Sequence, residues 1–299
     1  MRIVAWNCNM ALHAKAAGLL ALRPDIAVIS ECAEPDRLRL RGASWLESEP
    51  VWVGRNPHKG LAVFGFNGHS VRLAESYHAG LHYVAPVHVD GPTECNLLAV
   101  WAQNASSGSI RKRSLGPLRR AMARYRDFLS HPATLVAGDL NSNTIWDKPG
   151  WRINHSTKVR LLEEQFGLVS AWHAVTGEPH GAETVPTLYW RDRTKDGPTY
   201  HIDYVFLPSR WVDKAKVEIG TFERWCCAGL SDHAPVIVDV RGDVAARTTS
   251  IPTPRPAPGW RWCRRSAGTA WRTPRSRPAA PAGRARSGAT AARSARSAA

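Results

Sequence analysis

Acidic, amide and imidazole side chains follow apolar, strand-like runs at several points of this chain. The segments that carry them are WNCN at 6–9, ISE at 29–31, GDLN at 138–141, HIDY at 201–204 and SDH at 231–233. The ends of strands are where the sites of α/β proteins are usually assembled, whereas a strand that only enters a core tends to end in neutral turn residues. We therefore expect these polar groups to converge on one site.

Each of these groups also has a structural interpretation when it is taken alone. Asn7 can cap a turn, and Asp139 with Asn141 can form an Asx-turn. Glu31 can be a solvated residue at a strand end. Asp203 is harder to explain in this way, because it lies in an apolar run and a strand interior disfavours Asp unless the carboxylate has a partner. The joint pattern, more than any single residue, indicates a site.

The joint set suits a divalent cation and a phosphate substrate. Carboxylate and amide oxygens are the ligands that Mg²⁺ prefers, and a bound cation offsets the charge with which a phosphodiester repels a nucleophile. A carboxylate beside His233 fixes the tautomer of the imidazole and raises its pKa, which favours imidazolium. The amides of Asn7 and Asn141 can donate hydrogen bonds without adding negative charge.

Alternating helices and strands must position these residues. Residues 2–6 and 26–29 are short apolar runs, and Leu12, Ala16 and Leu19 recur between them at helical spacing, so the chain is predicted to open as a strand–helix–strand unit. The same spacing predicts helices over 115–129 and about 159–166. Further strands are predicted at 51–53, 61–66, 82–89, 96–102, 133–137, 201–207, 217–219 and 235–240.

A change of composition divides the chain into a domain at 1–243 and a tail at 244–299. The tail holds twelve arginines and no lysine or acidic residue, so it accounts for most of the formal charge of +15, and residues 1–243 carry only +3. The segment is rich in Arg, Ala and Pro and too poor in apolar residues to offset the entropy of folding, so we expect disorder. It is either a basic arm for an anionic surface or an extension without function, and we favour the second because Arg-rich sequence alone is weak evidence.

Composition also bounds the compartment. The six cysteines form no CxxC pair and no zinc-ligand spacing, which is typical of small buried residues in a reducing environment. The first residues enter a strand-like run with no signal-peptide pattern, and no apolar run is long enough to span a membrane. We therefore expect a cytoplasmic protein without a membrane span; the oligomeric state stays open.

The order of the polar motifs resembles the endonuclease/exonuclease/phosphatase superfamily. WNxN, a strand that ends in Glu, GDxN, a late ID-Y and a terminal SDHxP occur in that family's order, over about residues 1–240. The resemblance implies an α/β fold, a four-layered α/β sandwich of two packed mixed β-sheets flanked by helices, with the site at one edge of both sheets. It also implies Mg²⁺ or Mn²⁺ as the cofactor and a phosphoester as the substrate.

The resemblance assigns metal ligands. It implies that Glu31 is the principal metal-ligating carboxylate. Asn9 stands where relatives place an Asp or Asn near the metal, and Asp232 stands where they place a group that binds the metal directly or through a neighbour.

The resemblance assigns the catalytic groups in the same way. Asp139 would orient or deprotonate the attacking water, and Asn141 would donate to the scissile phosphate. Asn7 would contact the metal site or the phosphate. His233, oriented by Asp203, would contact the phosphate or assist proton transfer.

Three further residues are candidates for substrate binding. Trp101 stands where relatives carry a Tyr or His, and because an indole nitrogen cannot accept a proton, a general-acid role there is in doubt. Trp101 is then either a core or a stacking residue. Thr187 lies in a PTLYW run that resembles a segment bordering the family's site. His201 shares a strand face with Asp203, so it is either a site residue or a structural histidine.

These expectations define a function and leave rivals open. We predict a metal-dependent hydrolase that cuts a phosphodiester bond in DNA or RNA, as an endonuclease does. One alternative is a phosphatase or phosphodiesterase that acts on a lipid or inositol phosphate. The other is a catalytically inactive nucleic-acid-binding module, which Trp101 favours weakly and the intact acidic and imidazole set opposes.

Overall fold

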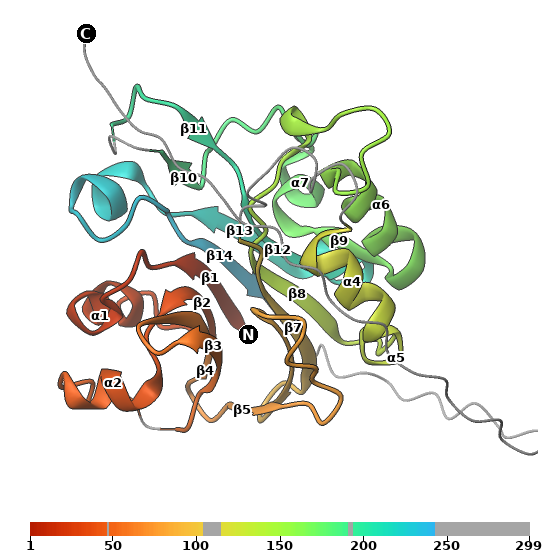
Figure 1. Cartoon of the computed structure of the whole chain (residues 1–299). Helices are drawn as coiled ribbons and strands as arrows, with labels where there is room; N and C mark the ends of the chain where they lie inside the picture. The colour runs from red at the N-terminus through yellow and green to blue at the C-terminus, as the bar shows by residue number, and fades with distance from the viewer. Residues whose placement is uncertain (47, 104–114, 191–193, 243–299) are drawn as a thin grey trace, which may run out of the picture. The chain divides into compact units, whose positions relative to one another are not determined.

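The structure is a computed structural model that describes residues 1–46, 48–103, 115–190 and 194–242 (Figure 1). The chain divides into two units, Met1–Thr248 and Thr249–Ala299, and only the first contains described residues. The tail predicted at 244–299 lies outside the described residues and stays a prediction. Within the described part, no helix is both long and apolar enough to cross a membrane.

The first sheet contains the first and the last strand of the described unit. Its order is β13 (Ala215–Ile219), β14 (Val236–Val240), β1 (Arg2–Asn7), β2 (Ile26–Cys32), β4 (Lys59–Gly65) and β3 (Val51–Asn56). β1 and β2 run parallel, as predicted for a strand–helix–strand opening, with α1 (Leu12–Leu20) as the crossover. The other neighbours pair antiparallel, so the sheet is mixed.

The second sheet is built in the same way. Its order is β5 (Ser70–Leu73), β6 (Val84–Asp90), β7 (Cys95–Trp101), β8 (Thr134–Asp139), β12 (Asp203–Pro208) and β9 (Leu168–Ser170). Here β7 and β8 are the parallel pair, and α4 (Gly116–Arg124) and α5 (Arg126–Leu129) lie in the connection between them. A separate small ribbon pairs β10 (Leu188–Tyr189) with β11 (Thr199–Tyr200).

Three apolar clusters hold four layers together (Figure 1). The central cluster lies between the sheets, where alternate residues of both meet, among them Ile3, Val28, Leu97, Leu135 and Val205. A second cluster joins the outer face of the first sheet to α1 and α2 (Pro35–Leu40), and a third joins the outer face of the second sheet to α4, α5 and α6 (His155–Phe166). The predicted four-layered α/β sandwich is confirmed.

The helix predicted over 115–129 is broken. α4 ends before Tyr125, whose backbone leaves the helical region at φ −107° and ψ 33°, and α5 begins after it. The Tyr125 hydroxyl accepts a hydrogen bond from the backbone N–H of His78 at 3.0 Å, a long-range contact that spacing along the helix does not reveal. The short elements α2, β5, β9, β10, β11 and α7 (Ala171–Thr176) were not predicted, because elements of a few residues carry too little periodicity to detect.

Strand direction brings the polar segments to one edge of the sandwich. β1 and β2 are parallel, with Asn7 opposite Ser30, so both deliver their last residues to the same edge. β12 runs antiparallel to β8, so Asp203 at its start lies opposite Asp139 at the end of β8. The segment 231–233 precedes β14, which is antiparallel to β1, and therefore reaches the same edge.

Candidate active site

Asn7 joins the two sheets at this edge through two hydrogen bonds that its side-chain amide donates. Its Nδ2 donates to Asp139 Oδ2 at 3.0 Å and to Glu31 Oε1 at 3.3 Å. Asn7 and Asp139 are buried, and Glu31 is half-buried. One amide therefore sets the spacing of two carboxylates that come from different sheets, and three of the predicted site residues are brought together.

Asp139 is held on both oxygens. The backbone N–H of Asn141 donates to Oδ1 at 2.8 Å, and the Asn141 side-chain amide donates to Oδ2 at 3.0 Å. The structure therefore contains the Asx-turn, and the role of this pair in a site stays a prediction. Asp139 is 1 % exposed, and burial together with the negative charge of Asp203 raises the pKa of its carboxyl group to about 7. A carboxylate with such a pKa can exchange a proton near neutral pH.

Asp203 and His233 form a buried pair. His233 Nδ1 donates to Asp203 Oδ2 at 2.8 Å, and the Thr187 hydroxyl donates to the same oxygen at 2.7 Å. Although burial by itself lowers the pKa of His233, the charge and hydrogen bond of Asp203, with a smaller effect of Asp139, raise it to about 10. The imidazole is therefore a cation at neutral pH, and Nε2 is the ring nitrogen that Asp203 does not contact.

Backbone contacts fix the position of His233. The Ser231 hydroxyl donates to the Asn7 carbonyl at 2.7 Å and accepts from the His233 N–H at 3.0 Å. The Trp6 indole donates to the His233 carbonyl at 3.0 Å. These bonds anchor the SDH segment on β1, whose last residue is Asn7. The His233 imidazole and the Asn7 amide are therefore both positioned by β1.

Glu31 forms an ion pair with Lys59, a residue that the sequence analysis did not select. It lies at a bulge between β2 and β4 with φ +60°, a conformation that turns its side chain out of the strand alternation. Lys59 Nζ lies 3.0 Å from Glu31 Oε2 and 5.4 Å from the centre of the Trp101 ring. Lys59 had no local signal, because only the pairing of β2 with β4 brings it to the site.

The donor set fits a hard divalent cation. Glu31 is only 17 % exposed at its side chain, and Asp203 Oδ1 is buried without a hydrogen-bond partner among the described residues. Carboxylate oxygens of Asp139 and Asp203 also lie within 4.8 Å of each other. Carboxylate oxygens in such numbers are the ligands of Mg²⁺ or Mn²⁺.

Asn9 and Asp232 lie beside this set. Asn9 follows β1 in a left-handed conformation, and its backbone N–H donates to Asn7 Oδ1 at 3.0 Å. Asp232 is half-buried, and its Oδ1 accepts from the Ser231 hydroxyl at 3.4 Å. Both residues stand at the same end of neighbouring strands as Glu31, but the structure describes no direct contact of their side chains with it. Their role as metal ligands stays a prediction.

The three residues predicted to bind substrate lie deeper. Trp101 is 3 % exposed in the cluster between the sheets and meets the Tyr83 ring edge-on at 4.6 Å. Thr187 is fully buried, and its hydroxyl also accepts from the backbone N–H of Asp203 at 3.0 Å, so it positions that carboxylate. His201 is buried, with Nδ1 at 3.0 Å from the Val185 carbonyl. The contacts of all three residues described here are with other residues of the protein, and their contact with a substrate stays a prediction.

An aromatic pocket of about 310 Å³ opens beside Asn141. Trp146 and Trp190 line it with 40 % and 42 % of their surface exposed, and the Tyr200 ring lies 4.8 Å and 6.2 Å from theirs. Tryptophan is on average a highly buried residue, but these two are partly exposed. Lys158 adds a buried ammonium to the lining. An aromatic pocket with a polar rim suits a flat or apolar group.

Comparisons with known proteins bear on the fold. No protein-family model matches the chain, and a search of curated proteins finds no similar sequence. The AP endonuclease LMAP from Leishmania major has a TM-score of 0.59 at 16 % identity, over 81 % of this chain and 87 % of that one. The 3′ phosphatase NExo from Neisseria, bound to a product DNA hairpin, has a TM-score of 0.60 at 17 % identity, over 81 % and 100 %. An endonuclease/exonuclease/phosphatase from Beutenbergia cavernae has a TM-score of 0.52 at 21 % identity, over 81 % and 71 %.

Proposed function

From the fold of the endonuclease/exonuclease/phosphatase superfamily, which this chain shares, we propose that it is a divalent-metal-dependent phosphoesterase that cuts a phosphodiester bond in nucleic acid. The observation that carries the proposal is the convergence of Asp139, Glu31 and the Asp203–His233 pair at one edge of the sandwich. An inactive binding module would have no need for a buried carboxylate whose pKa is raised beside an imidazole whose pKa is raised too.

The chain's own groups suit an attack by water on phosphorus. Asp139, with a pKa of about 7, accepts the proton of the attacking water. His233, held at Nδ1 by Asp203, offers Nε2 as a cationic donor to a phosphate oxygen, and the amide of Asn141 offers a neutral one. A divalent cation held by Glu31 would neutralise the phosphate charge when bound.

The pocket beside Asn141 favours nucleic acid over the other phosphoesters. Trp146, Trp190 and Tyr200 place exposed or half-buried rings at one opening, and stacking on aromatic rings is how single bases are held without sequence preference. Two of the structural neighbours are described as an AP endonuclease and a 3′ phosphatase bound to DNA, which supports the same substrate class. The alternative substrate is a lipid or inositol phosphate, and the first experiment distinguishes it from nucleic acid.

That experiment compares wild type with Glu31→Ala on plasmid DNA, an abasic-site duplex, bis-p-nitrophenyl phosphate and inositol phosphates. Each is incubated with Mg²⁺, with Mn²⁺ and with excess chelator. We expect metal-dependent cleavage of the nucleic acids that falls by about two orders of magnitude or more in Glu31→Ala, because the substitution removes the carboxylate that holds the cation.

Glu163→Ala is the matched control, since Glu163 is an exposed glutamate on α6 away from this edge, and we expect it to cleave at the wild-type rate. Cleavage that persists in chelator would contradict the metal dependence. Turnover of inositol phosphates alone would show that these, and not nucleic acids, are the substrates. DNA binding without turnover of any substrate would favour the inactive module.

A second prediction concerns the pocket. We expect Trp146→Ala to raise KM for an oligonucleotide by about 10-fold, the loss of one stacked base, while kcat changes little. Methyl p-nitrophenyl phosphate has no base that could stack on Trp146, so we expect its KM to be the same in Trp146→Ala and wild type. Leu40→Ala, which removes another exposed apolar side chain at a distance from the pocket, serves as the control. Equal KM values in Trp146→Ala and wild type would place the nucleotide elsewhere.

A third prediction concerns pH. The reactive form has Asp139 ionised and His233 protonated, so it is the major form between the two pKa values of about 7 and about 10. We expect kcat/KM to rise with pH until about 7, to level off, and to fall near 10. A bound cation favours the ionised carboxyl, so saturating metal should move the acid limb to lower pH. A rate that is highest at pH 5 would be incompatible with Asp139 as the base.

A further inference from the structure

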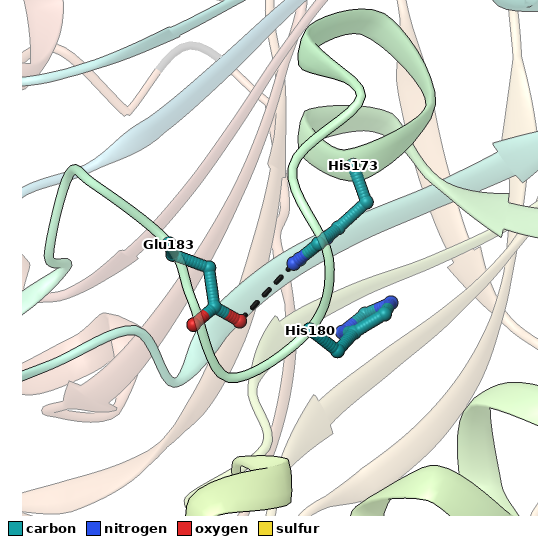
Figure 2. Close-up of side chains that lie close together, drawn as sticks. All are labelled: His173, His180 and Glu183. Carbon is teal, nitrogen blue, oxygen red and sulfur yellow. Dashed lines mark hydrogen bonds and ion pairs between the residues drawn. The ribbon is translucent and has the colours of Figure 1, made fainter.

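A cluster of two histidines and Glu183 lies outside the site described above. Figure 2 shows His173 on α7 pointing at Glu183 from the following loop, with the His180 ring beside both. His173 Nε2 lies 3.1 Å from Glu183 Oε1, and the His173 and His180 rings stack with centres 3.5 Å apart. One ligand atom from each of the three residues lies within 4.8 Å of the other two. The phosphoesterase chemistry proposed above uses none of them.

We propose that His173, His180 and Glu183 bind a zinc ion that braces the catalytic edge and is distinct from the hydrolytic cation. Two imidazole nitrogens and one carboxylate oxygen are a donor set that suits Zn²⁺, whereas the oxygen donors around Glu31 suit Mg²⁺ or Mn²⁺. The difference in donors lets the chain sort two metals between two sites. This inference does not depend on the proposed reaction.

The two proposed histidine ligands already have the supporting contacts that metal ligands have in proteins. His173 Nδ1 lies 2.8 Å from the Ser170 hydroxyl, which leaves Nε2 directed at Glu183. His180 Nδ1 lies 3.2 Å from Nε2 of His155. Such contacts of the second ring nitrogen fix the tautomer and the orientation of a ligating histidine.

Burial and charge are compatible with an ion at this place. The side chains of His173 and Glu183 are only 9 % and 5 % exposed, so the Glu183 charge is largely removed from water. His201, whose ring centre lies 5.6 Å from that of His173, has a buried Nε2 without a partner in the described part of the chain.

A modest rearrangement completes the site. Zinc bonds of about 2.0–2.2 Å place tetrahedral ligand atoms about 3.3 Å apart, close to the separation of His173 Nε2 and Glu183 Oε1. The two stacked imidazoles lie 14° from parallel, and their lone pairs lie in the ring planes, so the rings must tilt toward a common point. A water or the His201 imidazole can supply the fourth position.

The site is placed to stiffen the loop that carries catalytic groups. Asn143 Nδ2 donates to Glu183 Oε1 at 3.0 Å and to the His201 carbonyl at 2.9 Å. Asn143 follows Asn141 by two residues, and the loop that carries Glu183 continues to Thr187, which holds Asp203. A zinc ion here would tie α7 to both segments.

The test measures metal retention by the full chain. The protein is stripped with chelator, loaded with Zn²⁺, desalted and assayed for metal, and the same is done with Co²⁺ for its visible spectrum. We expect one zinc per chain, X-ray absorption with nitrogen and oxygen neighbours at about 2.0–2.2 Å, and a higher Tm with zinc than without. His180→Asn and Glu183→Gln should weaken zinc affinity by about 100-fold or more.

Two controls separate this site from the catalytic one. His131→Asn, which changes an exposed histidine on the loop before β8, and Glu31→Ala should both retain the zinc. The inference is overturned if wild type retains no zinc, if His180→Asn retains as much as wild type, if zinc is lost in Glu31→Ala instead, or if the spectra show sulfur ligands. The wild-type result alone decides if a variant does not fold.

Discussion

Asp139→Asn is expected to lower kcat by about two to four orders of magnitude, with a much smaller change in KM. The substitution keeps the size of the side chain but removes the group that accepts a proton from water. It also leaves one nitrogen where an oxygen now accepts from the backbone of Asn141 or from the amide of Asn7. Single-turnover hydrolysis at saturating Mg²⁺ or Mn²⁺ measures the chemical step directly.

Asp213→Asn controls for the loss of one carboxylate, because Asp213 is exposed and distant from this edge. Circular dichroism and Tm show whether Asp139→Asn remains folded. Loss of the acid limb of the pH profile, together with the loss of rate, identifies a base. A folded Asp139→Asn protein that keeps more than about a tenth of the wild-type kcat would remove Asp139 from the mechanism.

His233→Ala is expected to lower kcat by about two orders of magnitude or more, and Asp203→Asn by a comparable factor. The imidazole is a cation only because the buried carboxylate of Asp203 holds it, so removing the carboxylate lowers the pKa of His233 and frees its tautomer. The two residues act as one unit. We therefore expect the double variant to be no slower than the slower single variant.

Stability must be followed in the same set of proteins. His233→Ala leaves the Asp203 charge buried without its partner, which costs about 3–5 kcal/mol of unfolding free energy when a buried pair is broken. Assays at reduced temperature and a urea midpoint for each variant separate unfolding from a chemical defect. Rate losses that simply multiply in the folded double variant would show that His233 and Asp203 act independently.

The convergence of the polar residues at one edge could be predicted from the sequence because its signals are local, and their catalytic roles stay a prediction. Asp139 and Asn141 lie in one short motif, and a carboxylate in an apolar strand such as Asp203 needs a partner wherever it lies. Strand and helix periodicity located the long elements in the same way, and the four-layered sandwich followed from the resemblance of the motifs. What was missed at the fold level was short or, like the break at Tyr125, made by a contact from a distant part of the chain.

Only the tertiary structure decided the features that depend on residues meeting across the fold. Lys59 reaches Glu31 through the pairing of β4 with β2, and Trp146 and Tyr200 form a pocket wall through the packing of separate loops. His173 and Glu183 face each other because a loop folds back on α7. No periodicity encodes such meetings, since they arise from burial and chain direction acting over long separations. The sequence by itself determined which groups carry charge and chemistry, and the fold determined which of them touch.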